Sequence, residues 1–237
     1  MRQDLALDVE AIARTVALLR RRIEERFPDS GLGRVCRELE TITGQTRERA
    51  AWIATPILGL RAGVAALVAV IAAGLVGTVL SLHRPNQPME VFQFVQLLES
   101  GINDVVLVGA GVFFLLTLET RIKRRRALTA IRELRAIAHI IDMHQLTKDP
   151  EWIMTPAEAS TLLPERQMSR FELSRYLDYC SEMLSLVSKV AALYAQNIID
   201  PVVLSAVDQI EDLTTRLSGK IWQKIMILEQ MMGRERA

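Results

Sequence analysis

Residues 62–82 form a run of twenty-one residues, AGVAALVAVIAAGLVGTVLSL, in which no side chain is charged. A helix rises about 1.5 Å per residue, so a run of this length crosses the roughly 30 Å hydrocarbon core of a bilayer. The run begins far from Met1. We therefore expect it to stay in the mature chain as a membrane anchor rather than to be removed as a signal peptide.

A second apolar run, Val105–Leu118, lies between Asp104 and Glu119 and is shorter than most membrane spans. Five basic residues follow it within 121–126. Long basic side chains reach the headgroup region while their stems stay in the apolar layer, and this lengthens the usable span. We therefore predict a second transmembrane helix near 102–121, after a first span at about 60–82.

Lysine and arginine are distributed unevenly around these spans. The connecting segment 83–101 contains only Arg84, whereas Arg47, Arg49 and Arg61 precede the first span. Because basic residues favour the cytoplasmic side, residues 55–122 are predicted to form a hairpin in the plasma (inner) membrane, with an external loop at 83–101 and both termini in the cytoplasm. The residues predicted to bind lipid headgroups are Lys123, Arg124, Arg125 and Arg126.

The segments that flank the hairpin carry apolar residues at alternating spacings of three and four, which is typical of amphipathic helices. In the N-terminal segment 1–54 this pattern predicts helices over 5–27 and 32–53. The same pattern continues through 123–148, which indicates that the second span extends into the cytoplasm. Residues 149–169 contain three prolines and are predicted to be a linker with a short helix inside it, near 156–163.

The C-terminal segment 170–237 is predicted to be an antiparallel helical hairpin. Ser169 and Glu172 form a capping box at its start, and Asp200–Pro201 separates two long amphipathic stretches. The apolar seam of its first helix has to be buried, and burial within one chain or between subunits satisfies the pattern equally. The residues assigned to an oligomer or partner seam are Leu173, Leu177, Leu184, Val187 and Tyr194.

Composition agrees with this architecture. Half of the residues are hydrophobic and 24% are charged, yet the net charge is only +1, which argues against a general nucleic-acid-binding protein. No strand pattern occurs. The two cysteines, Cys36 and Cys180, are expected to be reduced and packed. The predicted fold is an all-α membrane protein, with a two-helix transmembrane hairpin and a cytoplasmic helical bundle or coiled-coil hairpin.

The most unusual polar group is formed by His139, Asp142 and His144. His139 and Asp142 are three residues apart and share a helix face, so a histidine–carboxylate pair with a ligand-binding or pH-sensing role is one interpretation, and a polar helix end is the other. His144 lies about 140° around the helix from His139, so the two imidazoles do not readily share a metal ion. We predict no metal site and no cofactor.

The middle of each span lacks polar side chains, and Asp104, Thr117 and Glu119 lie near the ends of the second span. Rings of these side chains in an oligomer would favour cations, whereas single copies simply mark the limits of the span. These residues are therefore the candidates for a pore or a selectivity filter.

No catalytic motif is present, so we do not expect an enzyme. The favoured hypothesis is a membrane-anchored helical interaction or scaffold protein that self-assembles, or binds a second helical protein, through its cytoplasmic amphipathic helices. The alternative is an oligomeric ion channel or pore-forming protein gated by the cytoplasmic bundle. A third hypothesis is an accessory subunit of a larger complex. The expected partners are the lipid bilayer and further copies of the chain, and not nucleic acid.

Overall fold

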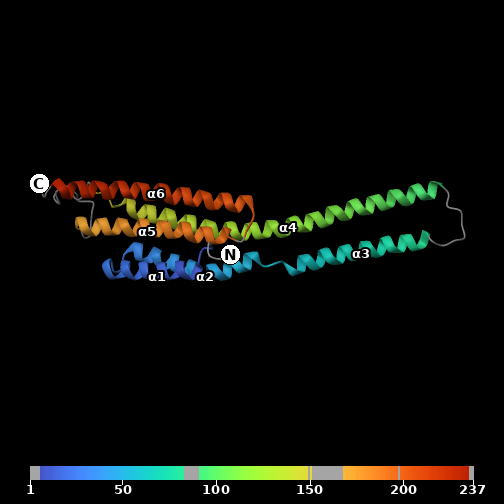
Figure 1. The fold of residues 1–237 in the computed structure, drawn as a ribbon, viewed down its shortest axis with the longest axis horizontal. Helices are drawn as coiled ribbons and strands as arrows, with labels where there is room; N and C mark the ends of the chain where they lie inside the picture. The colour runs from blue at the N-terminus through green and yellow to red at the C-terminus, as the bar shows by residue number, and fades with distance from the viewer. Residues whose placement is uncertain (1–5, 83–90, 149, 151–167, 197, 235–237) are drawn as a thin grey trace. The chain divides into compact units, whose positions relative to one another are not determined.

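The computed structural model describes residues 6–82, 91–148, 150, 168–196 and 198–234. Regular structure within these residues is α-helical, with no strand among them, which confirms the predicted all-helical class. Figure 1 shows the helices in chain order: α1 (Val9–Arg26), α2 (Gly31–Ala54), α3 (Leu58–Leu82), α4 (Val91–Leu146), α5 (Arg170–Ala195) and α6 (Pro201–Arg234).

The chain divides into two compact units. The first, which we call the bundle, comprises Met1–Ala54 and Arg126–Ala237. The second, the apolar unit, comprises Thr55–Arg125. Helix α4 contributes residues to both units.

Local polar contacts set the first helix boundaries of the bundle. Asp8 caps α1 by accepting a hydrogen bond from the backbone N–H of Glu10 at 2.9 Å, so the helix begins later than the predicted residue 5. At its other end, the N–H of Phe27 bonds to the carbonyl of Ile23. Asp29 then adopts a positive φ of 58°, a left-handed conformation that aspartate tolerates and that ends the helical path before α2.

The caps of α5 and α6 agree with the sequence. Ser169 accepts from the N–H of Glu172 at 3.2 Å, and the Glu172 carboxylate accepts from the N–H of Ser169 at 2.8 Å, which completes the predicted capping box. Asp200 accepts from the N–H groups of Val202 and Val203. Pro201, which lacks an N–H, occupies the first position of α6.

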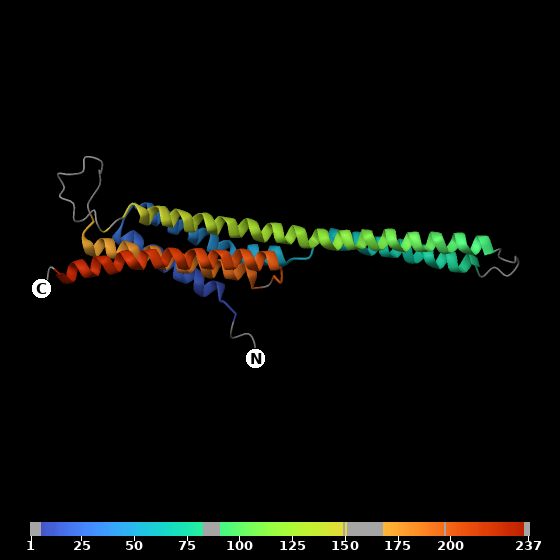
Figure 2. The ribbon, with the colours of Figure 1, turned by 90° about the horizontal axis from the view of Figure 1, so that it is seen from above.

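Helix α5 is the central helix of the bundle. It packs against α1, α2 and α6, and Figures 1 and 2 show α5 and α6 side by side in opposite directions. Its buried side chains extend well beyond one seam, since Tyr176, Tyr179 and Leu186 are buried as well as the residues of the predicted heptad. Phe27 packs edge-on against the rings of Tyr176 and Tyr179.

The last part of α4 also belongs to the bundle core. Ile131, Leu134 and Ile141 are at most 2% exposed, and they follow the predicted apolar pattern of this segment. Polar contacts attach the segment to its neighbours. Arg49 on α2 donates to Glu133 at 2.5 Å, and Arg135 donates to Gln209 on α6 at 2.7 Å.

The apolar unit contains two helices that are long and apolar enough to cross a membrane. None of the side chains in their most apolar windows is buried, unlike those in the core helix of a soluble protein. Helix α4 begins at Val91, within the predicted loop 83–101, because residues 91–98 already carry apolar side chains at helical spacing. Gly111 lies close to a side chain of α3, since a Cβ added to it would lie 3.2 Å from Cδ2 of Leu67, whereas a Cβ added to Gly63, Gly74 or Gly109 would meet nothing within 4 Å.

Candidate functional site

The predicted histidine group does not come together as one site. His139 is exposed, and His144 is half-buried. Asp142 accepts a hydrogen bond from Gln145 at 2.7 Å, and no contact between Asp142 and His139 is seen. Within the part of the chain that the structure describes, no group of three or more histidine, cysteine or acidic residues could hold a metal ion. The hydrogen bond of Asp142 is therefore a local contact within the last turn of α4.

His144 instead lies against the start of α2. A Cβ added to Gly31 would be only 2.2 Å from Cε1 of the imidazole, so this contact needs glycine. Burial lowers the pKa of His144, and the positive charges of Arg34 and Lys148 lower that pKa further. The ammonium of Lys224 lies in the same region and donates to the carbonyl of Lys148 at 3.4 Å. The neutral imidazole is thus the form that fits the contact.

We expect the stability of the bundle to fall as acid protonates His144. Since its pKa is lowered by folding, its contribution is complete above the unfolded pKa, and it is lost as the pH falls through that value towards the folded pKa. The check is thermal unfolding of the detergent-solubilised chain between pH 8 and about pH 5. His144→Gln should unfold with a shallower pH dependence in this range. His139→Gln, which changes an exposed imidazole on the same helix, is the control and should match the wild type.

The predicted partner seam is used inside a single chain. Its five side chains are at most 3% exposed, and three of them, Leu177, Leu184 and Val187, are completely covered. They face α1, α2 and α6 rather than a free surface. Any surface for assembly must therefore lie elsewhere on the bundle.

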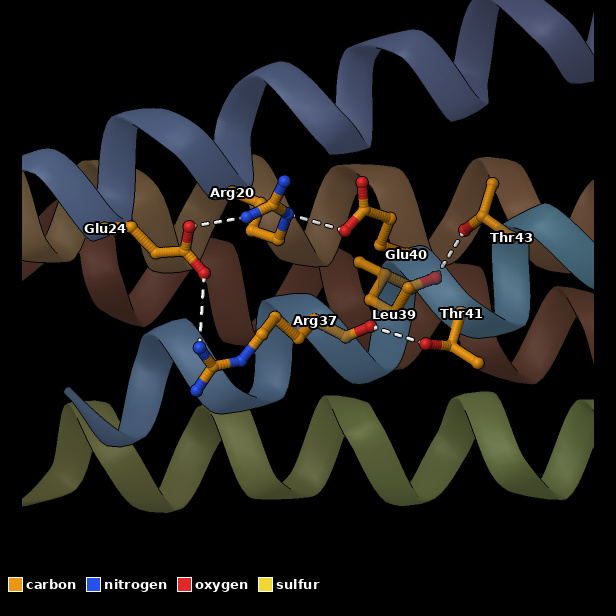
Figure 3. Close-up of polar contacts among 7 residues, drawn as sticks. All are labelled: Arg20, Glu24, Arg37, Leu39, Glu40, Thr41 and Thr43. Carbon is orange, nitrogen blue, oxygen red and sulfur yellow. Dashed lines mark hydrogen bonds and ion pairs between the residues drawn. The ribbon is translucent and has the colours of Figure 1, made fainter. Parts of the chain in front are cut away.

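Charged side chains between α1 and α2 form a network that holds these two helices together (Figure 3). Arg20 contacts Glu24 at 2.5 Å and Glu40 at 2.6 Å, and Arg37 contacts Glu24 at 3.3 Å. Two hydroxyls of α2, those of Thr41 and Thr43, bond to backbone carbonyls of their own helix. The acidic groups of this network are paired, so the network is a structural contact rather than a binding site.

The two cysteines are packed as expected. Cys36 and Cys180 are free and fully buried. Burial raises the pKa of each thiol to about 12, so neither forms the reactive thiolate at neutral pH.

A groove of about 500 Å³ lies between α1 and α6, with α5 as its floor. Trp222 forms one wall and is 58% exposed, while Ala11 and Thr15 line the opposite wall. Hydroxyl groups of Ser181 and Ser185 lie along the floor. Sequence reasoning missed this groove because Trp222 lies outside the buried seam of α6. An exposed tryptophan four residues before an exposed Met226 is the signal that would have indicated it.

The exposed faces beside the groove differ in charge. The face of α1 combines apolar side chains with two arginines and one glutamate, whereas the face of α6 combines apolar side chains with acidic ones. Burial raises the pKa of Asp178 on the floor, and the neighbouring charges of Glu182 and Glu229 add to this rise against Arg175 and Arg22. Arg14 also contacts Asp8, the capping residue of α1, at 4.0 Å. The α1 stripe consists of Ala11, Arg14, Leu18, Arg21 and Glu25, with Leu7 just before the helix, and the α6 stripe of Asp208, Glu211, Trp222, Met226 and Glu229.

The candidate pore residues lie in the apolar unit. Thr117 donates its hydroxyl to the carbonyl of Phe113 at 2.7 Å, within its own helix. Glu119 is only 9% exposed and contacts Lys123 at 2.8 Å and Arg61 at 3.5 Å. The side chain of Asp104 lies outside the described residues. Because two cations compensate the charge of Glu119, its geometry does not favour an acidic ring that selects cations.

The predicted headgroup ligands differ in their surroundings. Lys123 pairs with Glu119, Arg124 is half-buried and Arg125 is exposed. Arg126 stacks on the ring of Trp52, with its guanidinium carbon 3.7 Å from the ring centroid, and it also donates to the Trp52 carbonyl at 3.4 Å. The tryptophan is 56% exposed, so the pair forms a surface contact between α2 and α4.

The exposed surfaces among the described residues include the groove beside Trp222 in the bundle and the apolar faces of α3 and α4. No protein-family model matches the chain, and no curated protein or solved structure is significantly similar to it.

Proposed function

We propose that this chain is a membrane-anchored scaffold protein whose cytoplasmic bundle assembles with a second copy of itself. The membrane anchor is supported by the apolar unit, where Val70, Leu107 and Phe113 are each more than 70% exposed. Apolar exposure over the length of two helices exceeds what soluble monomers present to water. Lipid can cover such a surface without leaving backbone polar groups unpaired, because the N–H and C=O groups inside a helix bond to one another.

The orientation follows from the basic residues that flank both spans. Arg61 precedes the first span, and the cluster at 121–126 follows the second. This distribution supports a hairpin in the plasma (inner) membrane with both termini in the cytoplasm. In this orientation the bundle lies in the cytoplasm.

Self-assembly is supported by the two stripes beside the groove. The α1 stripe carries Arg14 and Arg21 around exposed Leu18, and the α6 stripe carries Glu211 and Glu229 around exposed Trp222. A two-fold interface brings the same two patches together twice, so α1 of each copy would lie on α6 of the other. This charge complementarity within one chain is the observation that carries the proposal, and it favours a second copy over an unrelated partner.

We expect Trp222→Asp to convert an assembled protein into a monomer. The substitution removes the large apolar side chain at the centre of the α6 stripe, and it places a carboxylate among the acidic side chains of the same stripe. The measurement is the detergent-corrected mass of the full-length protein by light scattering. Since Trp222 is half-exposed, the thermal midpoint of each monomer should change little. Ile140→Asp, which likewise replaces an exposed apolar side chain by a carboxylate but lies outside the groove, should leave the mass unchanged.

A charge exchange makes this test specific. The pair of changes Arg14→Glu and Arg21→Glu should weaken assembly, and adding Glu211→Arg and Glu229→Arg should restore it, because the attraction between the stripes is re-established with reversed signs. A wild-type protein that remains monomeric at all concentrations would overturn the proposal. So would a Trp222→Asp protein with the wild-type mass.

A further inference from the structure

A small cavity of about 260 Å³ opens between α3 and α4 in the apolar unit. Leu60, Val64 and Leu115 provide its apolar walls, and Arg61 and Glu119 provide its polar end. All five residues belong to the same compact unit. The cavity thus has one charged end and one apolar end, and it is complementary to an amphiphilic ligand.

The charged end holds a carboxylate between two cations. The carboxylate of Glu119 is nine-tenths buried, with one oxygen 2.8 Å from the ammonium of Lys123 and the other 3.5 Å from Nε of Arg61. Because cations enclose the carboxylate, the exposed part of this end is the guanidinium of Arg61, whose side chain is 60% exposed. An exposed guanidinium favours an anionic ligand.

Arg61 presents a fork of donors at this end. Its side chain is 60% exposed, and its contact with Glu119 uses Nε. The ion pair with Glu119 is the polar contact of this guanidinium seen among the described residues. The two terminal nitrogens of a guanidinium form a planar fork that matches two oxygens of a phosphate group. Glu119 is accordingly a positioning residue, because it acts through the guanidinium rather than on the ligand.

The position of the cavity along the spans matches the depth of lipid phosphates. Arg61 directly precedes the uncharged run 62–82, and Glu119 directly follows the apolar run 105–118. Both residues therefore mark the same edge of the apolar layer if the chain lies in a bilayer. At this edge, the phosphates of lipids lie level with the arginine, and their first acyl carbons lie level with Val64 and Leu115.

We propose that this cavity binds one membrane phospholipid, with the phosphodiester on the terminal nitrogens of Arg61 and the start of an acyl chain against Leu60, Val64 and Leu115. This inference rests on the membrane placement in the proposed function. It does not rest on self-assembly. Because zwitterionic and anionic phospholipids share the phosphodiester, the site recognises phosphate rather than a particular headgroup substituent.

The experiment is native mass spectrometry of the full-length protein in detergent, to which phosphatidylcholine or phosphatidylglycerol is added. We expect one retained lipid of either class on the wild type. Arg61→Gln should weaken retention by about tenfold or more, because it removes a charge-assisted bidentate contact. Arg61→Lys should retain an intermediate amount, since it keeps the charge and loses the fork. Inorganic phosphate at millimolar concentration should not compete, because it lacks the acyl chain.

The matched control is Arg121→Gln, which removes one exposed arginine two residues after Glu119 on α4 but lies outside the cavity. It should retain lipid as the wild type does. Equal loss in Arg121→Gln and Arg61→Gln would overturn the site in favour of general surface charge. Retention by Arg61→Gln at the wild-type level would overturn it too, as would competition by inorganic phosphate, which would indicate a free-anion site. Resistance of the same proteins to carbonate extraction tests the membrane anchor separately, so failure of the lipid site is distinguishable from failure of the anchor.

Discussion

A Leu184→Asp chain is expected to enter the membrane as the wild type does and to lose the cooperative unfolding of its bundle. Leu184 is 0% exposed at the centre of α5, the helix that contacts α1, α2 and α6. The substitution removes a buried leucine side chain and leaves a carboxylate without a partner, at a combined cost of about 5 kcal/mol or more. A domain is typically stable by only about 5–15 kcal/mol, so the bundle should be largely unfolded. Thermal unfolding followed by circular dichroism measures this loss.

The comparison that isolates burial is Ile140→Asp. Ile140 lies on α4 in the same bundle and is 42% exposed, so an aspartate at this position stays in water and should change the midpoint by only a few degrees. A Leu184→Asp protein that unfolds at the wild-type midpoint would show that α5 is not the centre of the bundle.

The second large effect is expected in the apolar unit. In a chain that carries both Val70→Asp and Leu107→Asp, the amount of protein integrated into the membrane should fall sharply. Both side chains are more than 70% exposed and lie inside the apolar runs. An aspartate near the middle of a span, as at position 70, costs about 3 kcal/mol on insertion scales. An aspartate at position 107, nearer the end of its apolar run, adds a smaller cost in the same direction. Resistance to alkaline carbonate extraction measures the integrated fraction.

Leu58→Asp serves as the control for this variant. Leu58 is 76% exposed at the first position of α3, but it lies before the uncharged run, where an acidic group stays near water. It should remain integrated like the wild type. If the double variant also remained fully integrated, the exposed faces of α3 and α4 would have to be covered by protein rather than by lipid.

Local signals in the sequence predicted the elements of the fold well. Ser169 and Asp200 cap the helices that they were expected to cap, because a side chain that bonds to a nearby N–H needs no information from distant residues. The apolar spacing in 123–146 likewise matched the buried side of α4. In each case the interaction extends over only a few residues along the chain.

The arrangement of the helices could not be predicted from the sequence, because it depends on contacts between residues far apart in the chain. A seam at spacings of three and four indicates one buried stripe, yet α5 buries side chains around most of its circumference because three helices surround it. The pairing of Arg61 with Glu119 joins residues that are separated by a whole hairpin. The groove beside Trp222 exists only because α1 and α6 lie on different sides of α5. The spacing of apolar residues along the chain gives no information about these contacts between distant residues.

The central position of α5 also has a consequence for biosynthesis. The ribosome makes α1 and α2 first, then α3 and α4, and α5 only after residue 169. During this interval α1 and α2 can pair with each other, but the side chains that they will place against α5 have no cover. The two apolar helices are therefore synthesised before the bundle is able to close. In a chain anchored as we propose, they can enter the membrane before the bundle fold is complete. A holding factor that shields the N-terminal helices at this stage would be needed only until α5 has been translated.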